Sequence, residues 1–272
     1  GITGEPEGGP VKSGVAMTDI LCGLHASTAI LAALYERQRQ QQLLADDDDD
    51  DKEIQGQHIN CSLMESQLST LANIGSNYLL GGDAYAEGRK WGTAHESIVP
   101  YQCFESSDGR IVFGALNDKQ WQSFCHDVLE SAFGDGRGTA LGSDARFSTN
   151  PERVKHRDEL LAIISDHISE LPTSSWLELM RSCSLPCAPV NSIAAAFGDE
   201  QATARDMVLE VEHPGCGRLK LAGFPFKFSR TPCAVRRAPP MLGEHSEELL
   251  GEVLNLSDDE IEELVSARVV GR

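Results

Sequence analysis

The sequence predicts an α/β fold, and three observations support this prediction. Apolar residues recur at spacings of three and four over long stretches such as 20–35, which is typical of helices. Short alternating runs such as 101–104 are typical of strands. The composition is that of an ordinary globular protein, with 40% hydrophobic and 24% charged residues in 272, which excludes collagen-like, coiled-coil and wholly disordered chains.

The chain is strongly acidic. Its 42 Asp and Glu against 23 Lys and Arg give a formal net charge of −19, and the run Asp46–Asp51 alone supplies six of the negative charges. Nucleic acid is therefore not an expected partner, because its backbone is also an anion. No apolar run approaches the roughly 20 residues that a membrane span needs, so we expect a soluble protein without a membrane partner.

Cysteines and the common catalytic motifs point to no metal site and to no common enzyme class. The eight cysteines are scattered through a long chain, so we expect reduced thiols in a reducing compartment. Cys183 and Cys187 have no second pair to complete four zinc ligands, and no metal is expected. The glycine-rich stretch 134–138 follows no strand and predicts a flexible loop rather than a phosphate cradle. H-E-x-x-H, G-x-S-x-G and Walker A motifs are absent from the sequence, which excludes the common zinc proteases, hydrolases and kinases.

The first third of the chain predicts helices interrupted by one insertion. A short apolar run at 15–17, which we expect to be a short strand, precedes a helix whose apolar spacing begins at Ile20, with Thr18 and Asp19 where an N-cap belongs. The low-complexity stretch over about 38–56 cannot bury a core, so it predicts a solvated insertion between a helix and a strand.

Strands and helices alternate beyond the insertion, and turn residues mark most of the boundaries. The last helix opens with Ser257-x-x-Glu260, a capping box. In order, we expect a strand over 57–63, a helix over 64–80, a polar loop over 83–97, a β-hairpin of 101–104 and 111–114, helices from 118 to about 198, a second hairpin of 208–213 and 218–221, and a helix over 257–265.

Asp19 is a candidate functional residue. A carboxylate in the first turn of a helix is stabilised as an anion by free backbone amides and by the helix dipole. In α/β folds, active sites lie beyond the carboxyl ends of strands, where Asp19 would stand after the run at 15–17. By spacing alone, however, an ordinary N-cap is the more common role of such an aspartate.

Four stretches of the chain share a pattern with one known family, in order and with compatible spacing. They are Ser13–Ile20 (SGVAMTDI), Gly56–Leu63 (GQHINCSL), Leu185–Val190 (LPCAPV), and Pro240–His245 (PMLGEH) followed by Ser257–Ile261. Together they resemble the nucleophile segment, the strand and helix that follow it, a loop of the small domain and the C-terminal signature of the family III CoA-transferases. The resemblance covers nearly the whole chain.

The resemblance implies an architecture. It is a Rossmann-like large domain, incomplete in this chain, plus a smaller α+β domain, in an interlocked homodimer in which each chain threads the other. Residues 1–90 would belong to the large domain, 91–206 would form the small domain, and 207–272 would return to the large one. The chain opens at Gly1 without a Met, so we expect a longer protein whose preceding part supplies most of the CoA-binding contacts and any targeting segment.

The resemblance also implies a chemistry. Lys90–Tyr101 (KWGTAHESIVPY) is most similar to the succinyl-CoA:glutarate (dicarboxylate) branch, which implies acyl-CoA and small carboxylic acids as substrates, and CoA as a substrate rather than a cofactor. The branch also implies the mitochondrial matrix as the location, with the cytoplasm as the alternative. Asp19 would attack the donor thioester and carry an aspartyl-CoA thioester. The backbone amides of Gly92 and Thr93 would stabilise the oxyanion. His95 would bind the second carboxylate of the substrate, or alternatively would bond its own turn.

Two alternatives stay open. The α-methylacyl-CoA racemases share the fold and use the equivalent aspartate as an acid or base beside an upstream His, but the Asp-Gly-Gly-Ala-Pro type of loop associated with them is absent from 93–101. The other alternative is an inactive truncated fragment with a dimerisation or interaction role. The acidic run Asp46–Asp51 favours such a role, whereas the intact Asp19 argues against it.

Overall fold

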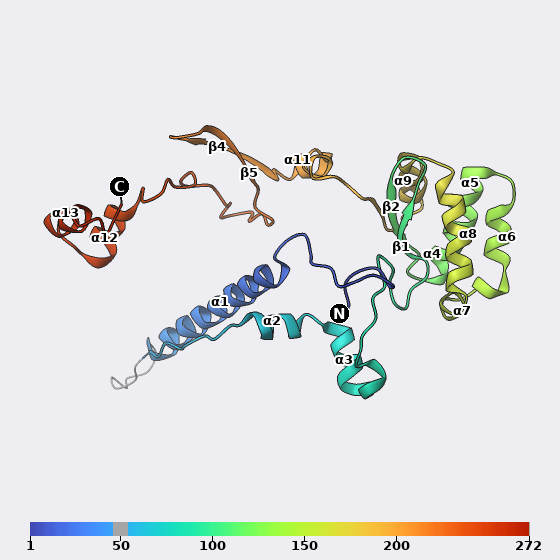
Figure 1. Ribbon diagram of the computed structural model, residues 1–272, viewed down its shortest axis with the longest axis horizontal. Coiled ribbons are helices and arrows are strands. Elements are labelled where there is room, and N and C mark those ends of the chain that lie inside the picture. Colours follow the sequence, from blue (N-terminus) through green and yellow to red (C-terminus); the bar gives the residue numbers. More distant parts are fainter. Residues whose placement is uncertain (46–53, 272) are drawn as a thin grey trace. The chain divides into compact units, whose positions relative to one another are not determined.

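Helices and sheets are mixed along the chain, as the α/β prediction requires (Figure 1). The computed structural model describes residues 1–45 and 54–271, which divide into two units, Gly1–Pro189 and Val190–Arg272. The acidic run Asp46–Asp51, at the centre of the predicted insertion, lies outside the described residues.

A three-stranded antiparallel sheet is the centre of the first unit. Strands β1 (Tyr101–Glu105) and β2 (Arg110–Gly114) form the predicted hairpin, with Tyr101 opposite Gly114. The third strand, β3 (Cys187–Pro189), pairs antiparallel with β2 and was not expected from the sequence.

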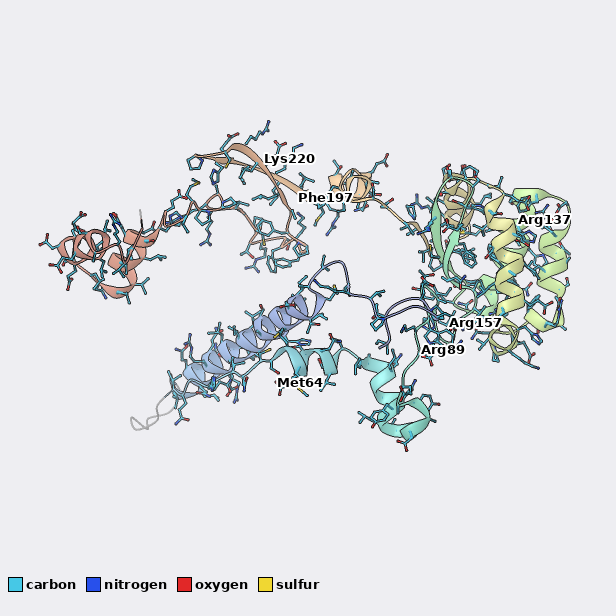
Figure 2. All side chains as sticks on the ribbon, viewed as in Figure 1. Met64, Arg89, Arg137, Arg157, Phe197 and Lys220 are labelled. Atoms are coloured by element: carbon cyan, nitrogen blue, oxygen red, sulfur yellow. The ribbon has the colours of Figure 1, made fainter. Side chains whose placement is uncertain are left out.

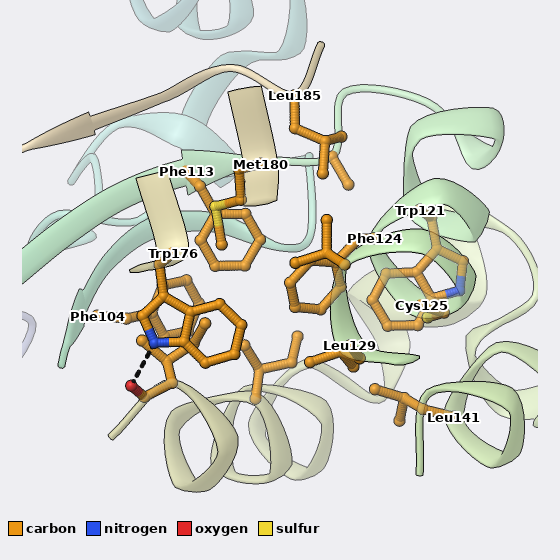
Figure 3. Packing of buried hydrophobic residues seen from close by; sticks show 14 of the residues in the cluster. Phe104, Phe113, Trp121, Phe124, Cys125, Leu129, Leu141, Trp176, Met180 and Leu185 are labelled. Atoms are coloured by element: carbon orange, nitrogen blue, oxygen red, sulfur yellow. Dashed lines mark hydrogen bonds between the residues drawn. The ribbon is translucent and has the colours of Figure 1, made fainter. Parts of the chain in front are cut away.

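Helices pack on this sheet and bury its aromatic side chains. Figure 3 shows Phe113 of β2 packed against Phe124, with ring centroids 4.8 Å apart. Trp176 is fully buried, and its indole N–H donates to the carbonyl of Ile168 at 2.8 Å. The helical elements here are α4 (Asp118–Ser123), the π-helical turn η2 (Phe124–Leu129), α5 (Glu130–Phe133), α6 (Arg137–Ser143), η3 (Ala145–Phe147), α7 (Asn150–Lys155), α8 (Arg157–Ser169) and α9 (Thr173–Ser182).

The glycine-rich stretch 134–138 is more ordered than predicted. Helix α6 begins at Arg137, and Gly138 is buried against the π-helical turn. A Cβ at Gly138 would lie 2.1 Å from the carbonyl oxygen of Cys125. The flexible-loop prediction is therefore wrong for the end of this stretch, because glycine serves there for close packing of two helical segments.

The first helix differs from the prediction at both ends. Helix α1 (Met17–Ala45) begins before Ile20, because the N–H of Ile20 already bonds the carbonyl of Ala16 at 3.1 Å. Residues 38–45, predicted as part of the insertion, are helical, since glutamine favours a helix about as well as leucine does.

Two predicted strands are absent from the described residues. Neither 15–17 nor 57–63 is a strand, because a strand requires a hydrogen-bonded neighbour and no described residue pairs with either run. The predicted helix over 64–80 is divided, and the chain turns at Ala72, whose φ is +44°. Its parts are α2 (Leu63–Ser69) and α3 (Ala72–Gly81), followed by the 3₁₀ turn η1 (Gly82–Tyr85).

Helix α1 is long and apolar. By length and composition, Met17–Leu44 could cross a membrane: its most apolar window of 18 residues has a mean hydropathy of 1.5, and none of that window is buried within the described chain. The sequence did not predict a membrane-length apolar run here because small and polar residues such as Gly23 and Thr28 interrupt the apolar positions of this helix. The interior helix of a soluble protein has the same composition, so the finding does not by itself indicate a membrane protein.

The second unit contains the other predicted hairpin. Strands β4 (Val208–His213) and β5 (Gly217–Ala222) pair antiparallel. Helix α13 (Asp258–Ser266) has the predicted capping box of Ser257 and Glu260. The other helices are α10 (Ile193–Phe197), α11 (Glu200–Ala204) and α12 (Ser246–Leu254), of which α11 and α12 lie beyond the predicted helical region and were not expected.

Candidate functional site

Asp19 is the third residue of α1, and its side chain is exposed. The N–H of Met17 bonds the carbonyl of Val15 at 2.9 Å, and the regular helical bonds begin at Ile20. Between them, the N–H groups of Thr18 and Asp19 have no acceptor within the described chain. Unbonded amides and the positive end of the helix dipole therefore lie next to the Asp19 carboxylate, an arrangement that favours negative charge.

Helix α2 holds the first turns of α1 in place, and the two helices lie side by side (Figure 1). The Thr18 hydroxyl donates to Gln67 Oε1 at 2.6 Å, one residue before Asp19. Farther along the same seam, His25 Nδ1 lies 3.3 Å from the hydroxyl of the buried Ser66. The position of Asp19 is thus set by contacts between two helices.

The loop over 91–97 brings together the other three predicted site residues. Gly92 has a φ of +60°, and its N–H donates to the carbonyl of Gly4 at 3.0 Å. The hydroxyl of Thr93 accepts from the N–H of Cys103 at 3.2 Å, whereas the N–H of Thr93 meets no acceptor in residues 1–45 and 54–271. Of the two amides predicted as oxyanion donors, the Gly92 amide is therefore occupied and the Thr93 amide is available.

The contacts of His95 determine which ring nitrogen is available. Its Nδ1 accepts from the N–H of Ser97 at 3.1 Å, so the neutral ring carries its proton on Nε2. The ring is stacked on Tyr101, with centroids 5.5 Å apart and planes 8° apart. The backbone N–H of His95 also donates to the carbonyl of Tyr101 at 2.8 Å. Bonding to its own turn thus occupies one nitrogen of His95 and leaves Nε2–H as a donor.

Two arginines, which sequence reasoning did not select, support this loop. Arg157 on α8 donates from Nη1 to the carbonyl of His95 at 3.0 Å and from Nη2 to the carbonyl of Glu96 at 2.6 Å. Its Cζ lies 4.8 Å from the centroid of the Trp91 ring, and the Cζ of Arg89 lies 4.1 Å from the same centroid. Figure 2 shows the two arginines close together. Burial, and secondarily the charge of Arg89, lowers the pKa of Arg157.

No sequence signal could have identified Arg157, because it lies 62 residues from His95 and occupies a helix start of ordinary composition. Arg89 lies in the predicted polar loop, two positions before Trp91 in the sequence, and only the fold shows that the two stack.

The structure does not bring Asp19 into contact with the 91–97 loop. Within the described residues, a cavity of about 170 Å³ beside the loop is lined by Tyr85, Arg89, Trp91 and Glu96 among others, and Asp19 is not part of it. No group of three or more His, Cys, Asp or Glu side chains in the described residues could hold a metal ion.

Comparison with known proteins relates the chain to one family. The family model described as CoA-transferase family III matches residues 1–246. The succinyl-CoA:glutarate CoA-transferase of Homo sapiens is 38% identical over 271 residues, and that of Mus musculus is 36% identical over 269; each match covers 99% of this chain and 56% of the relative. The succinate–glutarate CoA-transferase of Agrobacterium fabrum is 33% identical over 93% of this chain and 57% of the relative. The chain thus spans little more than half the length of these relatives.

Two solved structures are similar in fold to this chain. A CAIB/BAIF family protein from Brucella suis aligns with a TM-score of 0.70 and 31% identity, over 92% of this chain and 59% of that one. A Mycobacterium tuberculosis protein aligns with a TM-score of 0.69 at 21% identity, over 90% of this chain and 58% of that one, which shows a shared fold.

Proposed function

Because the chain belongs to CoA-transferase family III, we propose that the protein moves CoA from a succinyl-CoA-like donor to a glutarate-like dicarboxylic acid through a covalent intermediate on Asp19. The observation that carries the proposal is the exposed Asp19 carboxylate beside two unbonded amides at the start of α1, within the segment that resembles the nucleophile segment of the family. An aspartate is ionised at neutral pH, so it needs no general base to act as a nucleophile.

The proposed reaction consists of four acyl exchanges. The Asp19 carboxylate attacks the thioester carbonyl, the C–S bond breaks, and a mixed anhydride and CoA thiolate are formed. The thiolate attacks the Asp19 carbonyl of the anhydride, which releases the donor acid and leaves a thioester between Asp19 and CoA. The acceptor carboxylate attacks this thioester to give a second anhydride and thiolate. Attack of the thiolate on the acceptor acyl carbon then forms the new acyl-CoA and regenerates Asp19.

Each exchange passes through an oxyanion that needs hydrogen-bond donors, and each anhydride must be protected from water. The unbonded amides of Thr18 and Asp19 lie at the nucleophile itself. The Thr93 N–H would supply a donor from the loop, and Gly92 would contribute the backbone conformation that presents it. His95 would donate from Nε2 to the far carboxylate of a dicarboxylic acid, which is how it would bind substrate.

The test is to trap the acylated aspartate. The purified protein is mixed with succinyl-CoA and then with hydroxylamine, and its peptides are analysed by mass spectrometry. We expect a hydroxamate at Asp19, its loss in Asp19→Asn, and its retention in a control variant at an exposed aspartate of α8, Asp166→Asn. If Asp19 is never modified while acyl-CoA binds, the racemase or the non-catalytic alternative replaces this proposal.

We also propose an interlocked homodimer in the mitochondrial matrix. The apolar side chains exposed along α1 support association, because a soluble protein seldom leaves so large an apolar surface in water. Light scattering of the purified protein should give twice the mass of one chain, and fractionation of cells should recover the protein with the matrix. The most exposed of these α1 side chains are Ile20, Leu24, Leu31, Tyr35 and Leu43.

A further inference from the structure

Two cysteines lie together one helical turn beyond the candidate nucleophile. The Sγ atoms of Cys22, on α1, and Cys61, just before α2, are 3.6 Å apart. Both are free thiols; Cys61 is exposed and Cys22 is partly exposed. Neither takes part in the proposed transfer reaction.

We propose that Cys22 and Cys61 are a redox modification site, which a peroxide oxidises to a disulfide and a thiol reductant restores, and whose closure inhibits acyl transfer at Asp19. The formation of the disulfide is independent of the proposed function, and only the inhibition depends on it.

The local contacts assign different roles to the two sulfurs. Cys61 Sγ lies 3.6 Å from the carbonyl oxygen of Cys22 as well as from its Sγ, so the Cys61 thiol has two acceptors for its proton. The hydrogen bond to Cys22 raises the pKa of Cys61, which keeps that thiol protonated. Because the Cys61 proton is held by the carbonyl of Cys22, we assign the first attack to the Cys22 sulfur, which donates to no carbonyl in the described residues.

The chemistry balances with peroxide as the only added reactant. The Cys22 thiolate attacks one oxygen of hydrogen peroxide, the O–O bond breaks, and after proton transfer a sulfenic acid and one water are formed. The Cys61 sulfur then attacks the sulfenic sulfur, and its proton leaves with the hydroxide as a second water. Two thiols and one peroxide thus give one disulfide and two waters.

Closure acts on the surroundings of Asp19. Cys22 follows Asp19 by three residues, so both lie on the same face of α1. A disulfide requires the sulfurs to approach from 3.6 Å to about 2.05 Å, which draws the chain before α2 toward this face. The hydrogen bond from Thr18 to Gln67, which positions the residue preceding Asp19, spans the same seam between α1 and α2.

The experiment treats the purified protein with hydrogen peroxide, removes the excess with catalase, blocks remaining thiols with N-ethylmaleimide and analyses the peptides without reduction. We expect a cross-linked peptide pair that joins Cys22 to Cys61, and a loss of CoA transfer of at least fivefold that dithiothreitol reverses. Cys22→Ser and Cys61→Ser should each abolish both effects. The matched control Cys216→Ser removes an exposed thiol in the turn between β4 and β5 and should change neither.

The proposal is overturned if wild-type protein forms no Cys22–Cys61 cross-link, a result that does not depend on any variant folding. It is also overturned if the cross-link forms and the transfer rate is unchanged, or if the Cys22→Ser/Cys61→Ser double variant loses activity to peroxide as the wild type does. A protein that transfers no CoA before oxidation, yet forms the cross-link, would contradict the proposed function and not the redox site.

Discussion

The guanidinium of Arg157 holds the backbone carbonyl of His95, with Nη1 3.0 Å from the oxygen. The same guanidinium bonds the next carbonyl and stacks on Trp91. One side chain on α8 thus fixes the loop that presents the Thr93 amide and the His95 ring. The proposed substrate loop depends in this way on the helical core of the first unit.

Replacement of Arg157 by lysine should weaken this loop. An ammonium cannot reproduce the planar, two-carbonyl contact, so we expect the loss of about one charge-assisted hydrogen bond, or roughly 1.5–3 kcal/mol, and at least a tenfold fall in kcat/KM for the acceptor acid. Steady-state kinetics would measure this. Arg110→Lys, at an exposed ion pair with Glu105, is the control and should leave kcat/KM within about twofold.

Replacement of His95 by phenylalanine should impair acceptance of dicarboxylates more than that of monocarboxylates. The variant keeps a ring that can stack on Tyr101 but removes Nε2–H. Loss of one hydrogen bond to a charged group corresponds to about a tenfold higher KM for a glutarate-like acceptor. Comparison of KM for a dicarboxylate and for a monocarboxylate of equal length checks this, and an equal rise for both would contradict the assigned role.

Replacement of Gly138 by alanine should destabilise the first unit. Its Cβ would meet the carbonyl oxygen of Cys125 at 2.1 Å and the Cβ of Leu129 at 3.0 Å, and this overpacking costs about 1–3 kcal/mol. A Cβ at Gly23, inside α1, would meet no atom within 4 Å apart from the backbone of its own helix. Gly23→Ala should therefore stabilise the protein by roughly 0.5–1 kcal/mol. Urea denaturation of both variants gives the comparison, and a neutral Gly138→Ala would show that the two helical segments can separate.

Replacement of Arg153 by methionine should cost about 1–3 kcal/mol, since the fully buried guanidinium is removed and the backbone carbonyls that it bonds are left unsatisfied, whereas its ion-pair partner Asp118 is half exposed. The Arg153 guanidinium donates to the carbonyls of Val99 and Phe147 at 2.7 and 3.0 Å and to Asp118 Oδ1 at 2.8 Å. Arg110→Met, which breaks an exposed pair, should cost less than about 1 kcal/mol. Similar midpoints in urea for the two variants would refute the importance of the buried contacts.

Asp108 should make stability depend on pH. Hydrogen bonds from the N–H and hydroxyl of Thr173, at 2.8 and 2.9 Å, lower the pKa of Asp108. A carboxyl whose pKa is lower in the folded state contributes stability above its unfolded pKa and loses it as the pH falls through the folded value. Asp108→Asn should therefore melt below wild type at pH 7, and the difference should shrink toward pH 3. Asp166→Asn, at an exposed aspartate of α8, is the control, and a gap that widens in acid would contradict this assignment.

Local signals predicted the elements that local interactions form. The turn at Ser107-Asp108-Gly109 joins two alternating runs and specifies the hairpin of β1 and β2, and Ser257 and Glu260 carry the complete capping box of α13. The signals failed where pairing or packing comes from a distant segment. The runs 15–17 and 57–63 have strand-like residues but no described strand beside them.

By itself, the sequence determined the mixed α/β character, both hairpins, the family pattern, and the candidates Asp19, Gly92, Thr93 and His95. These follow from neighbours within a few residues or from stretches matched in order. Only the tertiary structure decided that Arg157 holds the carbonyl of His95, that the Gly92 amide is occupied by Gly4, and that Cys22 lies against Cys61. These contacts join residues that lie 39 to 88 positions apart in the sequence. No spacing pattern in a single sequence predicts them, because only the folding of the chain brings those atoms together.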